Sequence, residues 1–175
     1  MTVQTKIKVK RYAVYGIIIL LAHIFQNILT IFPEIVSVRP VLLISVALCI
    51  SMFEGEVVGT VAGLLSGALW DAFTVTADGY NALYLMVACA VCGMLLRIFM
   101  RNNIITYIMM NTGFTMLYFL SYVLFFITAR GIDGGAEMLL RYYLPMGIYS
   151  LALTPLWYVI IRAVNRKFSF SYTEY

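Results

Sequence analysis

The sequence predicts an all-α integral membrane protein, a single bundle of six transmembrane helices with both termini in the cytoplasm. Of its 175 residues, 63% are hydrophobic and only 11% are charged, whereas soluble domains are about a quarter charged. A chain this apolar has too little polar surface to cover a water-soluble globule. Its basic residues gather at the ends of apolar runs, where they indicate membrane topology rather than a nucleic-acid site.

Six apolar runs divide the chain, which we interpret as one transmembrane domain over residues 1–175. A spanning helix needs about 20 apolar residues, and the expected helices are 12–32, 41–53, 55–73, 79–100, 104–129 and 141–164. Pro33 ends the first helix, and Pro40 serves as the first turn of the second. Pro155 should kink the sixth, because proline removes a backbone donor and clashes with the preceding turn. We expect the tail after the sixth helix to be poorly ordered.

The distribution of Lys and Arg residues along the sequence predicts the orientation of the chain in the membrane. With the N-terminus in the cytoplasm, nine of the 12 Lys and Arg residues fall inside and three outside, which fits the positive-inside rule. The nine are Lys6, Lys8, Lys10, Arg11, Arg97, Arg101, Arg162, Arg166 and Lys167, and the three are Arg39, Arg130 and Arg141. The turn between the second and third helices is only Glu54-Gly55-Glu56, so a re-entrant segment over 41–73 is the main alternative.

Four glycines spaced four residues apart mark the third helix: Gly55, Gly59, Gly63 and Gly67. Residues four apart lie on nearly the same face of an α-helix, with a drift of about 40° per step. Glycine inside a helix costs roughly 1 kcal/mol relative to alanine, and in a membrane the usual reason is close approach by another helix. The stripe therefore predicts a helix-packing seam, either with another chain or, as we favour, with the protein's own second or fourth helix.

Asp71 continues the glycine spacing by one further step and is the candidate polar site. An ionisable group near hydrocarbon is costly unless it is paired or hydrated. We expect Asp71 to pair with Arg39, or to cap backbone donors of the loop that leads to Gly79. A contact to a partner or ligand and a structural role in ordering that loop are both open at this point.

The sequence also suggests contacts for two further groups of polar residues. Glu54 and Glu56 flank a predicted cytoplasmic turn, and Arg97 and Arg101 lie on the same side. Pairing across the turn is one interpretation. A solvated turn is the one we favour, because exposed pairs contribute only about 0–1 kcal/mol. His23 and the neighbouring amides Gln26 and Asn27 form a small polar face suited to bonding a neighbouring helix.

Several kinds of catalytic site are missing from the sequence. It has no phosphate-binding glycine loop followed by lysine, no nucleophile elbow, no zinc-protease motif and no paired intramembrane carboxylates. Catalysis needs convergent titratable groups near a pocket. We therefore expect a protein that is not an enzyme, with no catalytic residues, no metal and no cofactor.

Several features resemble the family of the rod shape-determining protein MreD. They are the basic N-terminus, the Arg39-Pro40 entry to the second helix, the third helix ending in LLSGALWDAF, and the opening of the fourth helix by Gly79–Leu83. The length and the series of apolar helices match along the whole chain, whereas the acidic turn at Glu54 and Glu56 departs from the family pattern. This family is in turn similar to the six-helix substrate-binding subunits of energy-coupling-factor transporters.

The resemblance implies a membrane scaffold of the bacterial elongation complex, located in the cytoplasmic membrane. It would bind the single-spanning protein MreC, and through it meet MreB filaments inside and the wall-synthesising polymerase and transpeptidase outside. The second likeness implies a different class, the vitamin-binding subunit of a transporter. That class needs an outward-facing pocket with aromatic and hydrogen-bonding groups, for which Tyr80, Asn81 and Tyr84 are the candidates. An enzyme of lipid chemistry ranks third.

Overall fold

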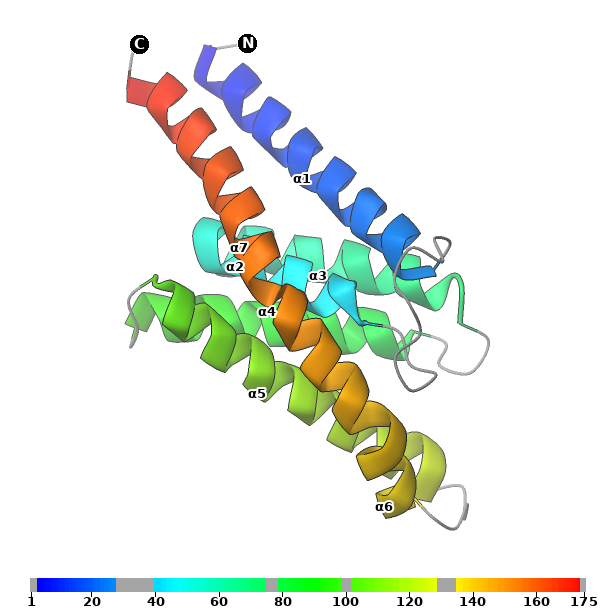
Figure 1. Cartoon of the computed structure of the whole chain (residues 1–175). Coiled ribbons are helices and arrows are strands. Elements are labelled where there is room, and N and C mark those ends of the chain that lie inside the picture. Colours follow the sequence, from blue (N-terminus) through cyan, green and yellow to red (C-terminus); the bar gives the residue numbers. More distant parts are fainter. Residues whose placement is uncertain (1–2, 28–39, 75–78, 99–101, 129–134, 174–175) are drawn as a thin grey trace.

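The computed structural model of the chain describes residues 3–27, 40–74, 79–98, 102–128 and 135–173 (Figure 1). Its α-helices are α1 (Val3–Asn27), α2 (Leu42–Glu54), α3 (Glu56–Asp71), α4 (Tyr80–Ile98), α5 (Ile104–Tyr122), α6 (Gly135–Met138) and α7 (Leu144–Thr173). Two π-helical stretches, η1 (Val123–Thr128) and η2 (Leu139–Tyr143), extend α5 and precede α7. Within these ranges all regular structure is helical, as expected.

Three helical segments are long and apolar enough to cross a membrane: Tyr80–Ile98, Ile104–Ile127 and Leu140–Phe168. They correspond to the fourth, fifth and sixth expected helices, and they indicate a membrane protein. The described part of α1 ends at Asn27, so its expected end near residue 32 lies outside the described residues. α2 has 13 residues and α3 has 16, which is shorter than the roughly 20 residues of a full span.

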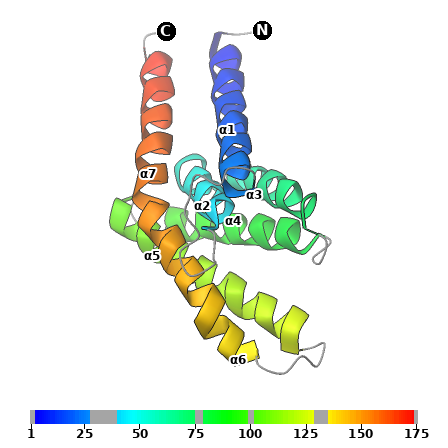
Figure 2. The same ribbon diagram turned by 45° about the vertical axis from the view of Figure 1, so that its right-hand side comes forward.

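The ends of two helices differ from the prediction. α1 begins at Val3, well before the expected start at residue 12, because lysine and arginine are good helix formers. Apolarity marks where a helix meets the bilayer and does not mark where the helix begins. α7 continues to Thr173, so the described part of the tail is helical, which the sequence did not predict. α7 also passes through Pro155 and changes direction near its middle (Figure 2).

α2 lies at the centre of the molecule. Every residue from Leu42 to Met52 is buried, which is what a continuous apolar run predicts for a helix surrounded on all sides. Gly55 joins α2 to α3 with a φ of 85°, a left-handed conformation that favours glycine because it lacks a Cβ atom. The result is a tight helical hairpin, an arrangement common to the two-span and the re-entrant interpretations of residues 41–73.

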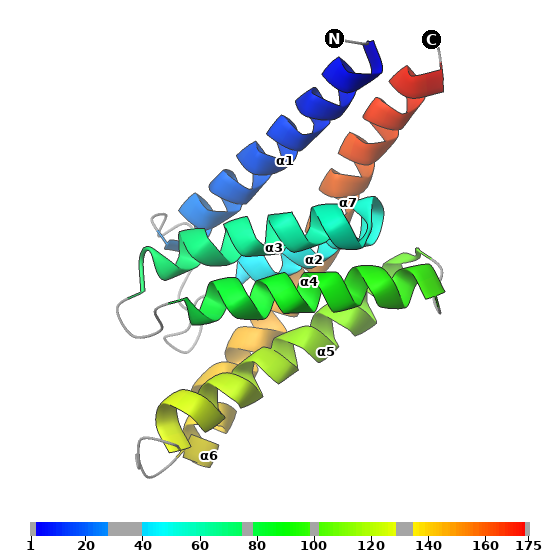
Figure 3. The same cartoon turned by 180° about the vertical axis from the view of Figure 1, so that it is seen from behind.

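The remaining helices surround this hairpin. α3 and α4 lie side by side and form the most extensive helix pair (Figure 3). α1 and α7 cross the other side of α2 and extend together beyond the body, so that both ends of the chain lie at the same end of the molecule (Figures 1 and 2). α5 packs against α7 and α2.

Candidate functional site

The glycine seam of α3 is covered by the protein's own helices. A Cβ atom added at Gly59, Gly63 or Gly67 would collide with atoms of a neighbouring helix. The facing groups are Ser51 of α2 for Gly59, the backbone of Leu85 in α4 for Gly63, and the backbone of Asn81 and Ala82 in α4 for Gly67. α2 and α4 are the two neighbours that the sequence favours, and both contact the seam.

α4 contributes to the same contact from its own side. Gly93 faces the backbone of Gly55 and Glu56, again too closely for a Cβ atom. Gly55 has a different role from the other glycines of the stripe, because a Cβ atom there would meet nothing within 4 Å. Gly55 is required by the turn and not by the seam, although all four glycines share one spacing.

Asp71 fastens the end of α3 to the start of α4. Its two carboxylate oxygens accept hydrogen bonds from the backbone N–H groups of Asn81, at 3.2 Å, and Ala82, at 2.8 Å. First-turn N–H groups lack a partner within their own helix, and a negative charge there is favoured by the helix dipole. The bonded N–H groups lie in the first turn of α4 and not in the loop that leads to Gly79, where they were expected. Gly79 itself has a φ of 78°. Arg39, the other expected partner, lies outside the described residues.

The start of α2 is capped by side chains from two other helices. The side-chain oxygen of Gln26 in α1 accepts hydrogen bonds from the backbone N–H groups of Leu42 and Leu43, at 2.8 and 3.1 Å. The Ser150 hydroxyl in α7 accepts one from the N–H of Val41 at 2.7 Å. Gln26 thus bonds a neighbouring helix, as predicted for the polar face of the first helix. The local sequence gives no sign that Ser150 would cap α2.

Two acidic residues beside the α2–α3 turn have different environments. The Glu54 side chain is 4% exposed and forms a 2.7 Å ion pair with Arg11. It also accepts hydrogen bonds from Tyr15 in α1 and Asn165 in α7. Glu56 is more exposed and pairs with Arg97 on α4. The favoured expectation of a solvated turn is therefore wrong, because Glu56 pairs across the turn and Glu54 joins α1, α2 and α7.

A buried polar cluster connects α2, α5 and α7. The Asn111 amide donates to the hydroxyls of Ser45, at 3.1 Å, and Thr154, at 2.8 Å. The Tyr107 hydroxyl donates to the backbone oxygen of Ser45 at 2.7 Å. These residues were not predicted to meet, because polar residues scattered over three apolar runs show a common site only when the helices are assembled.

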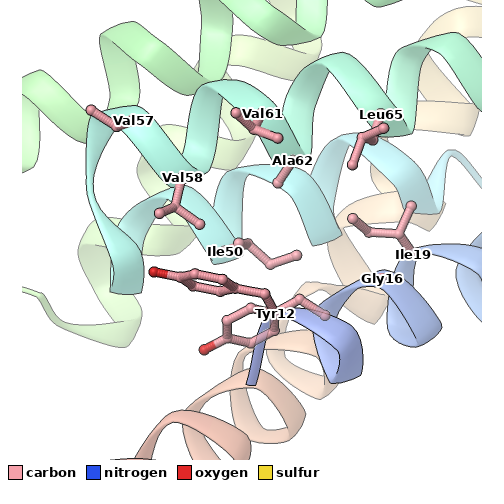
Figure 4. Close-up of a pocket in the computed structure, with 10 residues that line it drawn as sticks. Tyr12, Gly16, Ile19, Ile50, Val57, Val58, Val61, Ala62 and Leu65 are labelled. Atoms are coloured by element: carbon pink, nitrogen blue, oxygen red, sulfur yellow. The ribbon is translucent and has the colours of Figure 1, made fainter. Parts of the chain in front are cut away.

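The face of α3 opposite the seam borders an open groove of about 250 Å³. Figure 4 shows Tyr12, Gly16 and Ile19 of α1 on one side and Val58, Ala62 and Leu65 of α3 on the other. The groove is almost entirely apolar. This groove was not predicted from the sequence, although Val57, Val61 and Leu65 repeat every four residues along this face.

A second cavity, of about 150 Å³, lies at the other end of α3, near Asp71. Its walls are mainly aromatic side chains of α3, α5 and η2, and Asn81 of α4 also lines it. Of the expected pocket residues, Tyr80 and Tyr84 do not line this cavity. The Tyr84 hydroxyl instead donates to the backbone oxygen of Phe114 at 2.6 Å.

The described residues form a helical protein with three helices long and apolar enough to cross a membrane, and its named polar groups mostly connect one helix to another. In the described part of the chain, no group of three or more His, Cys, Asp or Glu side chains is placed to hold a metal ion. Comparisons with protein-family models, curated proteins and solved structures find no match to this chain.

Proposed function

We propose that this protein is a non-enzymatic membrane scaffold that docks the transmembrane helix of a single-spanning partner in the groove between α1 and α3. The observation that carries the proposal is the groove itself, which is open, apolar and about 250 Å³ in volume. The resemblance to the MreD family supports an MreC-like protein as the partner. The complex would help to organise peptidoglycan synthesis and cell shape in the bacterial elongation machinery, with MreB filaments and the wall-synthesising enzymes as indirect partners.

The dimensions of the groove suit a ridge of side chains on a partner helix. From Val57 to Leu65 the groove follows α3 for about 12 Å, at 1.5 Å per residue. Helices pack by inserting such ridges into grooves of this kind. In a bilayer, close van der Waals contact drives the association, because lipid is as apolar as the helices. Gly16 helps here, since the space around its missing Cβ atom is empty.

The position of the chain ends supports the proposed orientation, with both termini in the cytoplasm. The termini lie at the same end of the molecule (Figure 1), as an even number of membrane crossings requires. Exposed cations on the extending parts of α1 and α7, such as Lys6, Lys10 and Arg166, lie at this end. By the positive-inside rule this is the cytoplasmic side.

Filling the groove tests the proposal. Gly16→Leu places a large side chain in the groove, and we expect it to lower co-purification of a co-expressed MreC-like partner from membranes at least tenfold. Gly113→Leu is the matched control, since Gly113 on α5 also has empty space around its missing Cβ atom. The control should retain the partner. Undiminished co-purification with Gly16→Leu, in protein that melts normally, would contradict docking in this groove.

A vitamin-binding transporter subunit is the alternative class. It requires a substrate pocket, and the aromatic cavity near Asp71 has suitable chemistry. Its volume of about 150 Å³ is below the roughly 300–1,000 Å³ that is typical of ligand pockets. The scaffold is therefore the function that the geometry supports better. A tightly bound vitamin in the purified protein would favour the transporter subunit over the scaffold.

A further inference from the structure

The aromatic cavity near Asp71 has walls that are already packed in place. Its aromatic side chains include Tyr118 and Tyr122 of α5 and Tyr143 of η2. The ring centroids of Tyr118 and Tyr122 lie 6.0 Å apart, and those of Tyr122 and Tyr143 lie 5.9 Å apart. Trp70 of α3 also lines the cavity and lies 5.4 Å from the Tyr118 ring. Because these rings support one another, a molecule entering the cavity would meet a largely preformed surface.

One polar group in the cavity wall has unused hydrogen-bonding capacity. Asn81 is 1% exposed, and its side-chain oxygen accepts a hydrogen bond from the Tyr118 hydroxyl at 2.6 Å. An amide nitrogen carries two further donors. Among the described residues, none accepts a hydrogen bond from the Asn81 nitrogen, and this nitrogen is not one of the fully buried side-chain atoms that lack a partner. The nitrogen is therefore accessible. Because Asn81 lines the cavity, an acceptor placed there would gain a hydrogen bond from it.

The charges around the cavity favour a neutral occupant. None of the described residues that line it is charged. The nearby Asp71 carboxylate already accepts two hydrogen bonds from the backbone of α4. A charged molecule would lose part of its hydration here without gaining an opposite charge from these residues, and that exchange is costly.

The size of the cavity limits the ligand further. A cavity of about 150 Å³ in another protein holds one benzene ring, and aromatic walls pack well against the face or edge of a second ring. We propose that this cavity binds a neutral, planar, single-ring molecule whose hydrogen-bond acceptor meets the Asn81 amide nitrogen. The site is independent of helix docking in the groove between α1 and α3, and neither proposal depends on the other.

Binding of radiolabelled benzamide to the full chain in lipid nanodiscs tests the proposal. Benzamide has one planar ring and a carbonyl acceptor, and we expect saturable binding that excess unlabelled benzamide displaces. Benzoate adds a charge, and cyclohexanecarboxamide replaces the planar ring with a puckered one. Each should compete at least tenfold more weakly than benzamide. Equal competition by either compound, or uptake that does not saturate, overturns the proposal using the unmodified protein alone.

Two substitutions test whether benzamide binds in this cavity. Met146 lines the cavity, and Met146→Trp should abolish saturable binding by filling it. Met109→Trp is the matched control, because Met109 is 61% exposed on α5, and it should bind benzamide normally. If Met146→Trp fails to fold, Met146→Phe provides a smaller filling and should weaken binding at least tenfold. Binding that survives in a folded Met146 variant overturns this location.

Discussion

The two faces of α3 have opposite roles. Gly59, Gly63 and Gly67 face α2 and α4 so closely that a Cβ atom would collide with them. Val57, Val61 and Leu65 are offset by two residues, which is about 200° around the helix, and are 52–73% exposed. The glycines of this helix therefore mark a contact already made within the protein. The surface left for another molecule is formed by its large apolar side chains.

Disrupting the seam face should have the largest effect. Gly67→Leu forces a side chain against the backbone of α4, which cannot move aside as a flexible side chain can. Overpacking commonly costs about 1–3 kcal/mol, and we expect more here, enough to abolish recovery of folded protein. Size-exclusion chromatography after detergent extraction measures the recovery. Gly113→Leu is the control. A normal elution profile for Gly67→Leu would show that α3 and α4 can move apart without loss of the folded protein.

Glu54 at the turn beside α3 should have the next largest effect. Glu54→Ala leaves Arg11 partly buried without its partner, and removing one member of a buried pair costs about 3–5 kcal/mol. Glu56→Ala breaks a more exposed pair, which is worth about 0–1 kcal/mol. Thermal unfolding in detergent should separate the two variants clearly. Equal melting temperatures would mean that the contacts of Glu54 with α1 and α7 contribute little.

Asp71 should have a moderate effect. Asp71→Asn removes the negative charge at the start of α4 and converts one of its two acceptor oxygens into a donor. A hydrogen bond to a charged group contributes about 1.5–3 kcal/mol, so we expect a loss of about 2 kcal/mol in unfolding free energy. Partner association should be unchanged, because the groove is elsewhere. Loss of partner binding by a stably folded Asp71→Asn protein would instead assign Asp71 to a partner contact.

Changes on the groove face should have the smallest effect on stability. Val61→Ala shortens an exposed side chain, and such surface substitutions usually change stability by less than about 0.5 kcal/mol. Its effect should appear in co-purification of the MreC-like partner, which we expect to fall severalfold. Leu64→Ala is the control, because Leu64 is exposed on α3 but does not line the groove. Equal recovery of the partner from the two variants would show that the partner does not dock in this groove.

Local chemistry was sufficient to predict much of the fold. Apolar run lengths predicted the helices now seen as α4 and α5, since a run of that length and hydropathy is helical wherever it lies in a bilayer. The glycine spacing predicted a close contact along α3, because side-chain positions repeat with the helical turn. Local chemistry did not predict the true start of α1 or the end of α7, where helix continues into polar sequence.

Tertiary structure decided which groups meet. Ser51 lies opposite Gly59, Gln26 and Ser150 cap α2, and Asn111 joins three helices, and each contact depends on how helices distant in sequence cross. It also decided that Gly55 forms the turn while the other glycines of its stripe form the seam. The residue spacing along α3 is enough to give this helix one face of small residues and one face of large apolar residues. The packing of α2, α4 and α1 closes the first face and leaves the second beside a groove, because helical periodicity is local while the choice of neighbour is not.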